Sequence, residues 1–166
     1  MTISEPIELQ NSGLVNLVAD EERCALLKEI AANLPDITLN DRQLCDLELL
    51  ATGAFSPLTG FMIRSDYESA LDRMRLQDGT LWPIPICLDI SEIKGQSLEA
   101  GQSVGLRDPE GFLLAVMHIE DIWQIDREKE AVQLYGTRDR NHPGVNDLFK
   151  SSGKYYIGGN LEVVSL

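Results

Sequence analysis

The chain has 166 residues, of which 43% are hydrophobic and 25% charged, and this composition suits one globular domain with a sizeable core. Its formal net charge of −13 disfavours nucleic acid and anionic lipid, which bind through lysine and arginine. No apolar run approaches the ~20 residues of a membrane span, and the N-terminus lacks the features of a signal peptide. Three cysteines without a CxxC pair suit a reducing compartment. We therefore expect a soluble, cytoplasmic protein that binds neither nucleic acid nor membrane.

The chain begins with a polar segment and then turns helical. Residues 1–19 are polar with scattered apolar positions, and we expect an extended arm there. Apolar residues at helical spacing predict a helix over residues 21–33, which Pro35 ends. We expect the arm to be separate from one folded domain over residues 20–166.

Two further helices are predicted from capping signals. Asn40 and Gln43 form a capping-box pair at the start of one helix, and Gly53 ends it. Ser65 and Glu68 form a similar S-x-x-E pair at the start of the next helix. The residues expected on one side of that second helix are Tyr67, Ala70, Leu71 and Met74.

The second half of the chain is richer in strand patterns. The predicted elements are a strand over 84–90, a hairpin of 102–107 with 112–119, strand-like residues 121–126, helices over 127–136 and 142–153, and two short strands about Gly158 and Gly159. Helices followed mostly by strands indicate an α+β fold, either a strongly curved mixed sheet or a small β-barrel, with helices at its ends.

The densest unusual segment is TGAFSPLTGF, residues 52–61. It is neither a P-loop nor a nucleophile elbow, because the required glycine, lysine and serine spacings are missing. Its glycines, proline and hydroxyls are all turn formers, so a rigid connector is the plainer interpretation.

His118 is expected to be a satisfied sheet histidine, and His142 to cap a helix or orient a loop. The other acidic residues are expected on solvated faces, so the residues alone predict no assembled active site.

Several blocks of the sequence, taken together, resemble a known enzyme family. In chain order these blocks are LNDRQLCDLELL (39–50), GAFSPLTGFMIRSDY (53–67), MRLQDGTLWPIPICLDI (74–90), LRDPEGFLLAV (106–116), YGTRDRNHPGV (135–145) and YYIGGNLEV (155–163). They look like the N-terminal PUA-like domain of ATP sulfurylase (sulfate adenylyltransferase), which makes adenylyl sulfate and pyrophosphate from ATP and sulfate. That family's catalytic motifs lie in a following nucleotidyltransferase domain and have no counterpart here.

The resemblance implies a structural or assembly role in sulfate assimilation or sulfur oxidation, without catalytic, cofactor-binding or metal residues on this chain. Mg-ATP is expected only for the full-length enzyme. The expected partners are a catalytic nucleotidyltransferase domain, in cis or in trans, and further copies in a homo-oligomer. The apolar, strand-like end near Leu166 suggests a fragment of a longer chain.

Two alternatives remain, namely a stand-alone PUA-type module that binds RNA or protein, and a regulatory subunit that acts in trans. The residues that carry the family signature, with an expected structural or interface role, are Gly53, Phe55, Ser56, Pro57, Leu58, Gly60, Phe61, Arg64, Asp66, Tyr67, His142 and Pro143.

Overall fold

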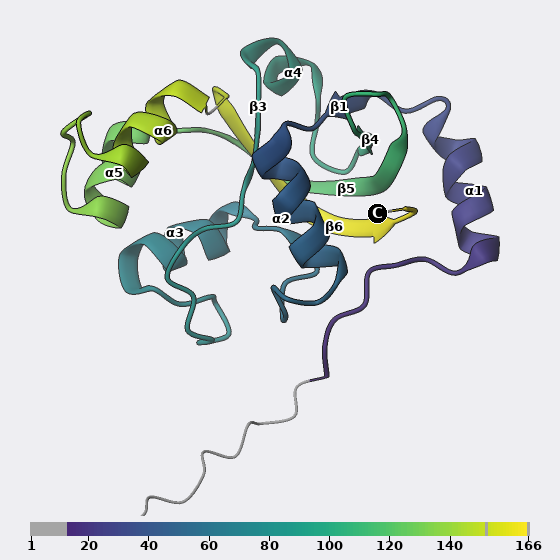
Figure 1. Cartoon of the computed structure of the whole chain (residues 1–166), viewed down its shortest axis with the longest axis horizontal. Coiled ribbons are helices and arrows are strands. Elements are labelled where there is room, and N and C mark those ends of the chain that lie inside the picture. The colour runs from purple at the N-terminus through teal and green to yellow at the C-terminus, as the bar shows by residue number, and fades with distance from the viewer. Residues whose placement is uncertain (1–12, 152, 166) are drawn as a thin grey trace, which may run out of the picture.

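A computed structural model of the chain describes residues 13–151 and 153–165 and places a six-stranded mixed sheet at its centre (Figure 1). The strands are β1 (Asp36–Thr38), β2 (Gly60–Phe61), β3 (Leu88–Ile90), β4 (Ser103–Arg107), β5 (Leu113–Gln124) and β6 (Tyr155–Val163). The helices are α1 (Glu21–Ala31), α2 (Asp41–Ala51), α3 (Arg64–Arg73), α4 (Glu92–Ser97), α5 (Arg127–Tyr135) and α6 (Pro143–Ser151). The sheet has the order β1-β4-β5-β6-β2, with β3 also paired to β6, and it does not close into a barrel. The predicted α+β class with a mixed sheet is confirmed.

β5 and β6 form the longest antiparallel pair of the sheet, from Ala115 with Val163 to Gln124 with Tyr155. The prediction of two short strands about Gly158 and Gly159 is wrong, because β6 runs unbroken through both glycines. A Cβ at Gly158 would lie 2.1 Å from the carbonyl oxygen of Met62, and one at Gly159 would lie 2.0 Å from that of His118. The glycines therefore allow neighbouring backbone to approach β6 closely and do not end it.

The two predicted capping boxes have different outcomes. At α2 the pair is present: Gln43 N–H donates to Asn40 Oδ1, and Asn40 N–H donates to Gln43 Oε1, both at 3.0 Å. At α3 the prediction is wrong, because the N-cap is Ile63, which makes no side-chain bond to the helix. Met74 adopts a left-handed conformation after α3 and is 58% exposed, so it does not share the buried side of that helix.

The segment before β3 also departs from its prediction. A strand was expected over 84–90, but only Leu88–Ile90 is a strand, and Ile84 is exposed. Pro83 and Pro85 lack the backbone donors that a ladder needs, so pairing begins after them. The hairpin of β4 and β5 and the helices α5 and α6 are as predicted. The short elements β1, β2 and α4 had no recognised signal in the sequence.

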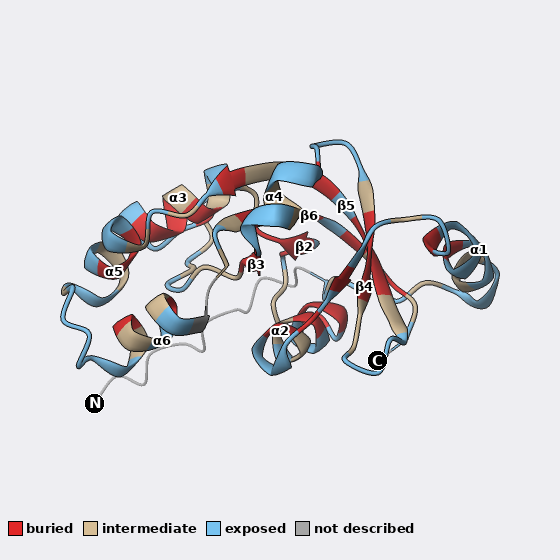
Figure 2. Cartoon of the chain, turned by 90° about the horizontal axis from the view of Figure 1, so that it is seen from above, coloured by how far each residue is buried: buried red, intermediate tan, exposed pale blue. Residues whose placement is uncertain are grey.

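The buried residues form three separate hydrophobic clusters, and Figure 2 colours the buried positions red. The largest cluster packs α2 and α3 against the sheet, through side chains that include Leu50, Leu71 and Met117. A second cluster packs Leu27 of α1 against Val116 of β5, and a third lies between α5 and α6. Among the described residues, no helix is long and apolar enough to cross a membrane.

The described part of the arm lies along the end of β6. Ala19 N–H donates to Val163 O at 2.9 Å, and Val163 N–H donates to Leu17 O at 2.8 Å. Residues 13–19 form no helix, and a single bridge of Val18 with Val163 joins them to the sheet. Residues 1–12 of the expected arm lie outside the described residues.

Candidate functional site

The loop at residues 53–61 holds the arm in place. Ser56 Oγ accepts a hydrogen bond of 2.9 Å from Val15 N–H and donates one of 2.7 Å to Gly53 O. Gly53 has φ +78°, and a Cβ there would lie 2.7 Å from Val15 O. The peptide bond between Ser56 and Pro57 is cis. The hydroxyl of this signature serine is therefore engaged in bonds within the domain.

The second half of the loop joins the sheet as β2. Gly60 pairs with Asn160, and Phe61 pairs with Gly159. A Cβ at Gly60 would lie 2.0 Å from Gly159 O, so only glycine fits there. Leu58 and Phe61 are buried in the main core, and Phe55 packs edge-to-face on the ring of Trp82, with ring centroids 5.9 Å apart. These contacts make the loop a corner that fixes α2 to β6.

Arg64 and Asp66, which follow the loop, also form internal bonds. Arg64 N–H donates to Asp121 Oδ2 at 3.2 Å, and its guanidinium pairs with Glu68 at 2.9 Å. Asp66 Oδ1 accepts from Gln77 N–H at 2.8 Å. Arg64 thus joins the start of α3 to β5, and Asp66 joins it to the turn that follows the helix.

Tyr67 belongs to a buried polar cluster. Its hydroxyl donates to Glu130 Oε2 at 2.9 Å, and the hydroxyl of Tyr156 donates to the same carboxylate at 3.2 Å. Burial raises the pKa of Glu130, although the two tyrosyl hydrogen bonds oppose this effect. Burial also raises the pKa of both tyrosines, so both stay protonated as donors at neutral pH. The ring of Trp123 lies 5.5 Å from that of Tyr67 and 5.7 Å from that of Tyr156.

The sequence reasoning missed Glu130, because acidic residues outside motifs were expected on solvated faces. That expectation is wrong for Glu130 and for Asp89, which are both buried. Asp89 is satisfied by Arg42 at 2.6 Å, by Gln43 at 3.0 Å and by Gly153 N–H. No local signal indicated the burial of Glu130, because its partners lie 63 and 26 positions away in the sequence.

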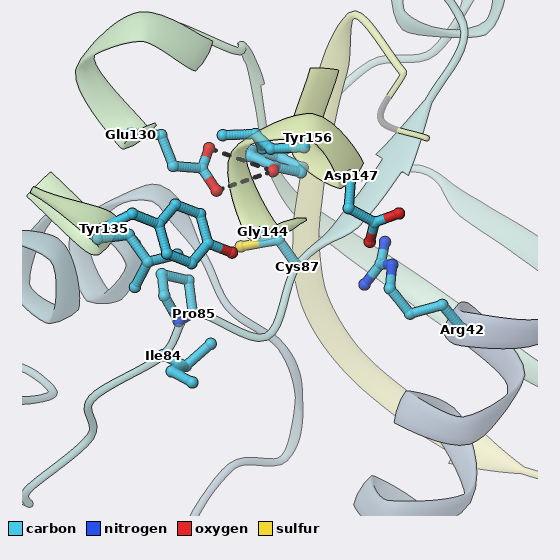
Figure 3. A pocket seen from close by; sticks show the side chains of 11 residues that line it. Arg42, Ile84, Pro85, Cys87, Glu130, Tyr135, Gly144, Asp147 and Tyr156 are labelled. Atoms are coloured by element: carbon cyan, nitrogen blue, oxygen red, sulfur yellow. Dashed lines mark hydrogen bonds between the residues drawn. The ribbon is translucent and has the colours of Figure 1, made fainter. Parts of the chain in front are cut away.

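A cavity of about 150 Å³ opens beside this cluster (Figure 3). Its lining residues come from α2, α5, α6, β6 and the segment before β3, and they are Arg42, Ile84, Pro85, Cys87, Glu130, Leu134, Tyr135, Gly144, Asp147, Leu148 and Tyr156. In Figure 3, Glu130 and Tyr156 lie on one side of the cavity, and Arg42 and Asp147 lie on the other. Burial raises the pKa of the Cys87 thiol, so this cysteine is held as a neutral thiol.

His142 and Pro143 lie at the start of α6, next to this cavity. His142 Nδ1 accepts from Val145 N–H at 3.4 Å, and the imidazole lies 5.0 Å from the ring of Tyr135. Pro143 occupies the first position of the helix, where a missing N–H costs nothing. His142 therefore caps the helix, and it lies apart in the fold from the loop at 53–61.

A second charged network joins α1 to the sheet. Arg23 binds Glu162 through two nitrogens, at 2.6 and 2.7 Å. His118 Nε2 lies 2.9 Å from Glu162, and its Nδ1 lies 2.8 Å from Ser103 Oγ, so His118 is a satisfied sheet histidine as expected. The hydrogen bonds from Arg23 lower the pKa of Glu162 to about 2. Among the described residues, no group of three or more His, Cys, Asp or Glu side chains is placed to hold a metal ion.

Comparison with known proteins assigns this fold. A family model described as a PUA-like domain matches residues 7–166, almost the whole chain. The chain belongs to the PUA-like domain family. The resemblance seen in the sequence is confirmed at this level.

The curated relatives of this PUA-like domain include several sulfate adenylyltransferases. Over 90% of the chain, it is 43% identical to the enzyme of Mycosarcoma maydis, of which it covers 26%. Over 95% of the chain, it is 38% identical to the enzyme of Synechococcus sp., of which it covers 40%. The chain thus spans between about a quarter and two-fifths of the length of these relatives.

A solved structure has the same fold as this PUA-like domain. A chain of the hexameric APS kinase from Thiobacillus denitrificans superposes with a TM-score of 0.71 and 32% identity. The match covers 92% of this chain and 26% of the kinase chain. In the kinase, as in the sulfate adenylyltransferases, the matched region is a minor part of a longer chain.

Proposed function

We propose that this chain is the N-terminal PUA-like domain of a cytoplasmic sulfate adenylyltransferase and that its role is structural. The proposal rests on the difference in length between this chain and its relatives. The alignments with two sulfate adenylyltransferases cover 90% and 95% of this chain but only 26% and 40% of those enzymes. The catalytic residues and the Mg-ATP site then belong to the remaining part of such an enzyme. This domain packs against the catalytic nucleotidyltransferase domain and helps to shape the assembly.

The bonding of the signature residues supports a structural role. Ser56, Asp66 and Tyr67 all direct their polar atoms to other groups of the same domain. The APS kinase from T. denitrificans that shares this fold is hexameric, which favours a homo-oligomeric assembly for the parent enzyme of this chain. The surface charge does not favour the RNA-binding alternative, because the chain carries 27 acidic and 14 basic residues.

The test is a pyrophosphate-release assay of the chain with ATP, Mg²⁺ and sulfate. The Synechococcus enzyme, assayed at the same molar concentration, serves as the positive control. We expect release above background from the control alone. Sulfate-dependent release by this chain that scales with its concentration would overturn the assignment of a structural role.

A further inference from the structure

The cavity beside α5 contains a carboxylate with unused hydrogen-bonding capacity. Glu130 is 5% exposed, and its described partners are the hydroxyls of Tyr67 and Tyr156. An ionised carboxylate offers about four acceptor positions, and two hydroxyl donors do not fill them. The structure therefore shows a buried acceptor at the edge of a cavity of about 150 Å³.

The charges around the cavity favour a cation. Its charged lining residues are Glu130, Asp147 and Arg42. The guanidinium of Arg42 is already bound to Asp46 at 2.7 Å and to Asp89 at 2.6 Å, so these two carboxylates offset its charge. When it is ionised, the buried carboxylate of Glu130 repels sulfate, phosphate and nucleotides and attracts a positively charged group.

The shape and the walls of the cavity restrict that group further. Its volume equals that of about five water molecules. Apolar wall is supplied by Ile84, Pro85, Leu134 and Leu148. Ile84 is 58% exposed and Tyr135 is 36% exposed, so the lining of the cavity reaches the surface at these two residues. These features suit a small cation with a short aliphatic chain.

We propose that this cavity binds a primary alkylammonium group, whose N–H groups donate to Glu130 and whose alkyl chain lies against Ile84, Leu134 and Leu148. This site lies beyond the structural role proposed above and does not depend on it. The ammonium supplies three donors, which suits an under-filled carboxylate, and charge-assisted bonds of this kind are about twice as strong as neutral ones. A lysine side chain carries the same chemistry as a free amine, so the test includes both sources.

Binding is expected to depend on the ionisation of Glu130. The titratable and charged groups around it are the hydroxyls of Tyr67, Tyr135 and Tyr156, the Cys87 thiol, Asp147, Arg127 and Arg42, and the two arginines favour its ionised form. Burial raises the pKa of Glu130, and a bound cation opposes that shift by stabilising the carboxylate. Affinity should therefore fall as the pH is lowered through the carboxyl range.

The test is an NMR titration of the ¹⁵N-labelled chain with propylammonium chloride, at constant ionic strength, with n-propanol as the uncharged analogue. We expect saturable shifts at the lining residues with propylammonium and much weaker shifts with n-propanol. Glu130→Gln should weaken binding at least about tenfold. Glu128→Gln, an exposed change on the same helix, should leave binding unchanged. Equal binding by Glu130→Gln, equal binding of n-propanol, or no saturable shift would overturn the proposal.

A second variant covers the case in which Glu130→Gln does not fold. Ile84→Trp fills the mouth of the cavity from an exposed position and should weaken propylammonium binding, whereas Leu81→Trp, exposed outside the lining, should not. Unchanged binding by Ile84→Trp would contradict the location of the binding site.

The peptide acetyl-Gly-Lys-Gly-amide, titrated in parallel, distinguishes a lysine side chain from a free amine as the source of the ammonium group. Tighter binding of the peptide would assign the site to a lysine of a protein, and tighter binding of propylammonium would assign it to a free amine.

Discussion

Tyr67 of α3 donates a hydrogen bond of 2.9 Å to Glu130 of α5, across 63 positions of the sequence. Tyr156 of β6 donates to the same carboxylate, so one buried side chain links two helices and strand β6 of the sheet. The signature residue Tyr67 is therefore part of the internal framework that holds α3 and α5 in place.

Removing this carboxylate should destabilise the fold. Glu130→Ala leaves two buried hydroxyls without their acceptor and opens a void, and we expect it to lower the free energy of unfolding by about 3 kcal/mol. Glu130→Gln keeps an acceptor oxygen and should cost less than half as much. Urea denaturation followed by circular dichroism measures both. The matched control is Glu128→Ala, an exposed ion-pair partner of Arg138, which should change stability by less than about 1 kcal/mol. Equal losses at positions 128 and 130 would refute the linking role.

Acid should weaken the attachment of α1 through Glu162. Its pKa is about 2 in the folded state, against about 4.3 for an unfolded chain. A lowered pKa contributes stability above the unfolded value, and this contribution is lost as the pH falls from about 4.3 towards 2. Glu162→Gln should therefore make unfolding free energy less dependent on pH in this range than it is in the wild type. Urea titrations at a series of pH values test this, with Glu29→Gln on the exposed side of α1 as the control. An unchanged pH dependence in Glu162→Gln would contradict the assignment.

The hydroxyl of Ser56 should hold the arm against the loop. Ser56→Ala removes the acceptor of Val15 N–H and the donor to Gly53 O, and we expect a loss of about 1 kcal/mol. Hydrogen exchange at the Val15 amide should accelerate at the same time. Ser97→Ala removes an exposed local bond to Lys94 O and should affect neither quantity. Unaltered exchange at Val15 in Ser56→Ala would show that the loop does not hold the arm.

Gly60 should be the least replaceable residue of the loop. A Cβ there would lie 2.0 Å from the backbone oxygen of Gly159, so Gly60→Ala must separate β2 from β6. We expect a loss of about 3 kcal/mol or more, measured as a lower midpoint of thermal unfolding. At Gly13 a Cβ meets nothing within 4 Å, so Gly13→Ala should be neutral. A wild-type midpoint for Gly60→Ala would mean that β2 does not pack as described.

Local signals in the sequence predicted the parts of the fold that local bonds determine. The Asn40–Gln43 pair begins α2 where expected, and the Asp108–Gly111 turn closes the hairpin with a bond of 3.1 Å. The Ser65–Glu68 pair fits the same pattern but lies inside α3. There Glu68 accepts from Arg64, which already belongs to the helix, so the pattern does not mark a cap at this position.

Features that depend on distant contacts were not predictable in this way. Gly158 and Gly159 suggested a break, but in β6 they admit the backbones of the Met62 segment and of His118. Glu130 has the composition of a solvated helical residue, and its burial depends on two tyrosines 63 and 26 positions away. The identity of the loop at 53–61 came from resemblance to a family, because its residue types indicate only a turn.

We propose above that this chain is the PUA-like part of a sulfate adenylyltransferase whose chemistry lies in another domain. The most direct measurement is pyrophosphate release, with ATP, Mg²⁺ and sulfate, by a chimera in which this chain replaces the matching segment of the Synechococcus enzyme. Our account predicts that the chimera is active, that the Synechococcus enzyme lacking that segment is impaired, and that the chain alone releases none. A chimera that folds and assembles but has no activity, or turnover by the chain alone, would contradict it.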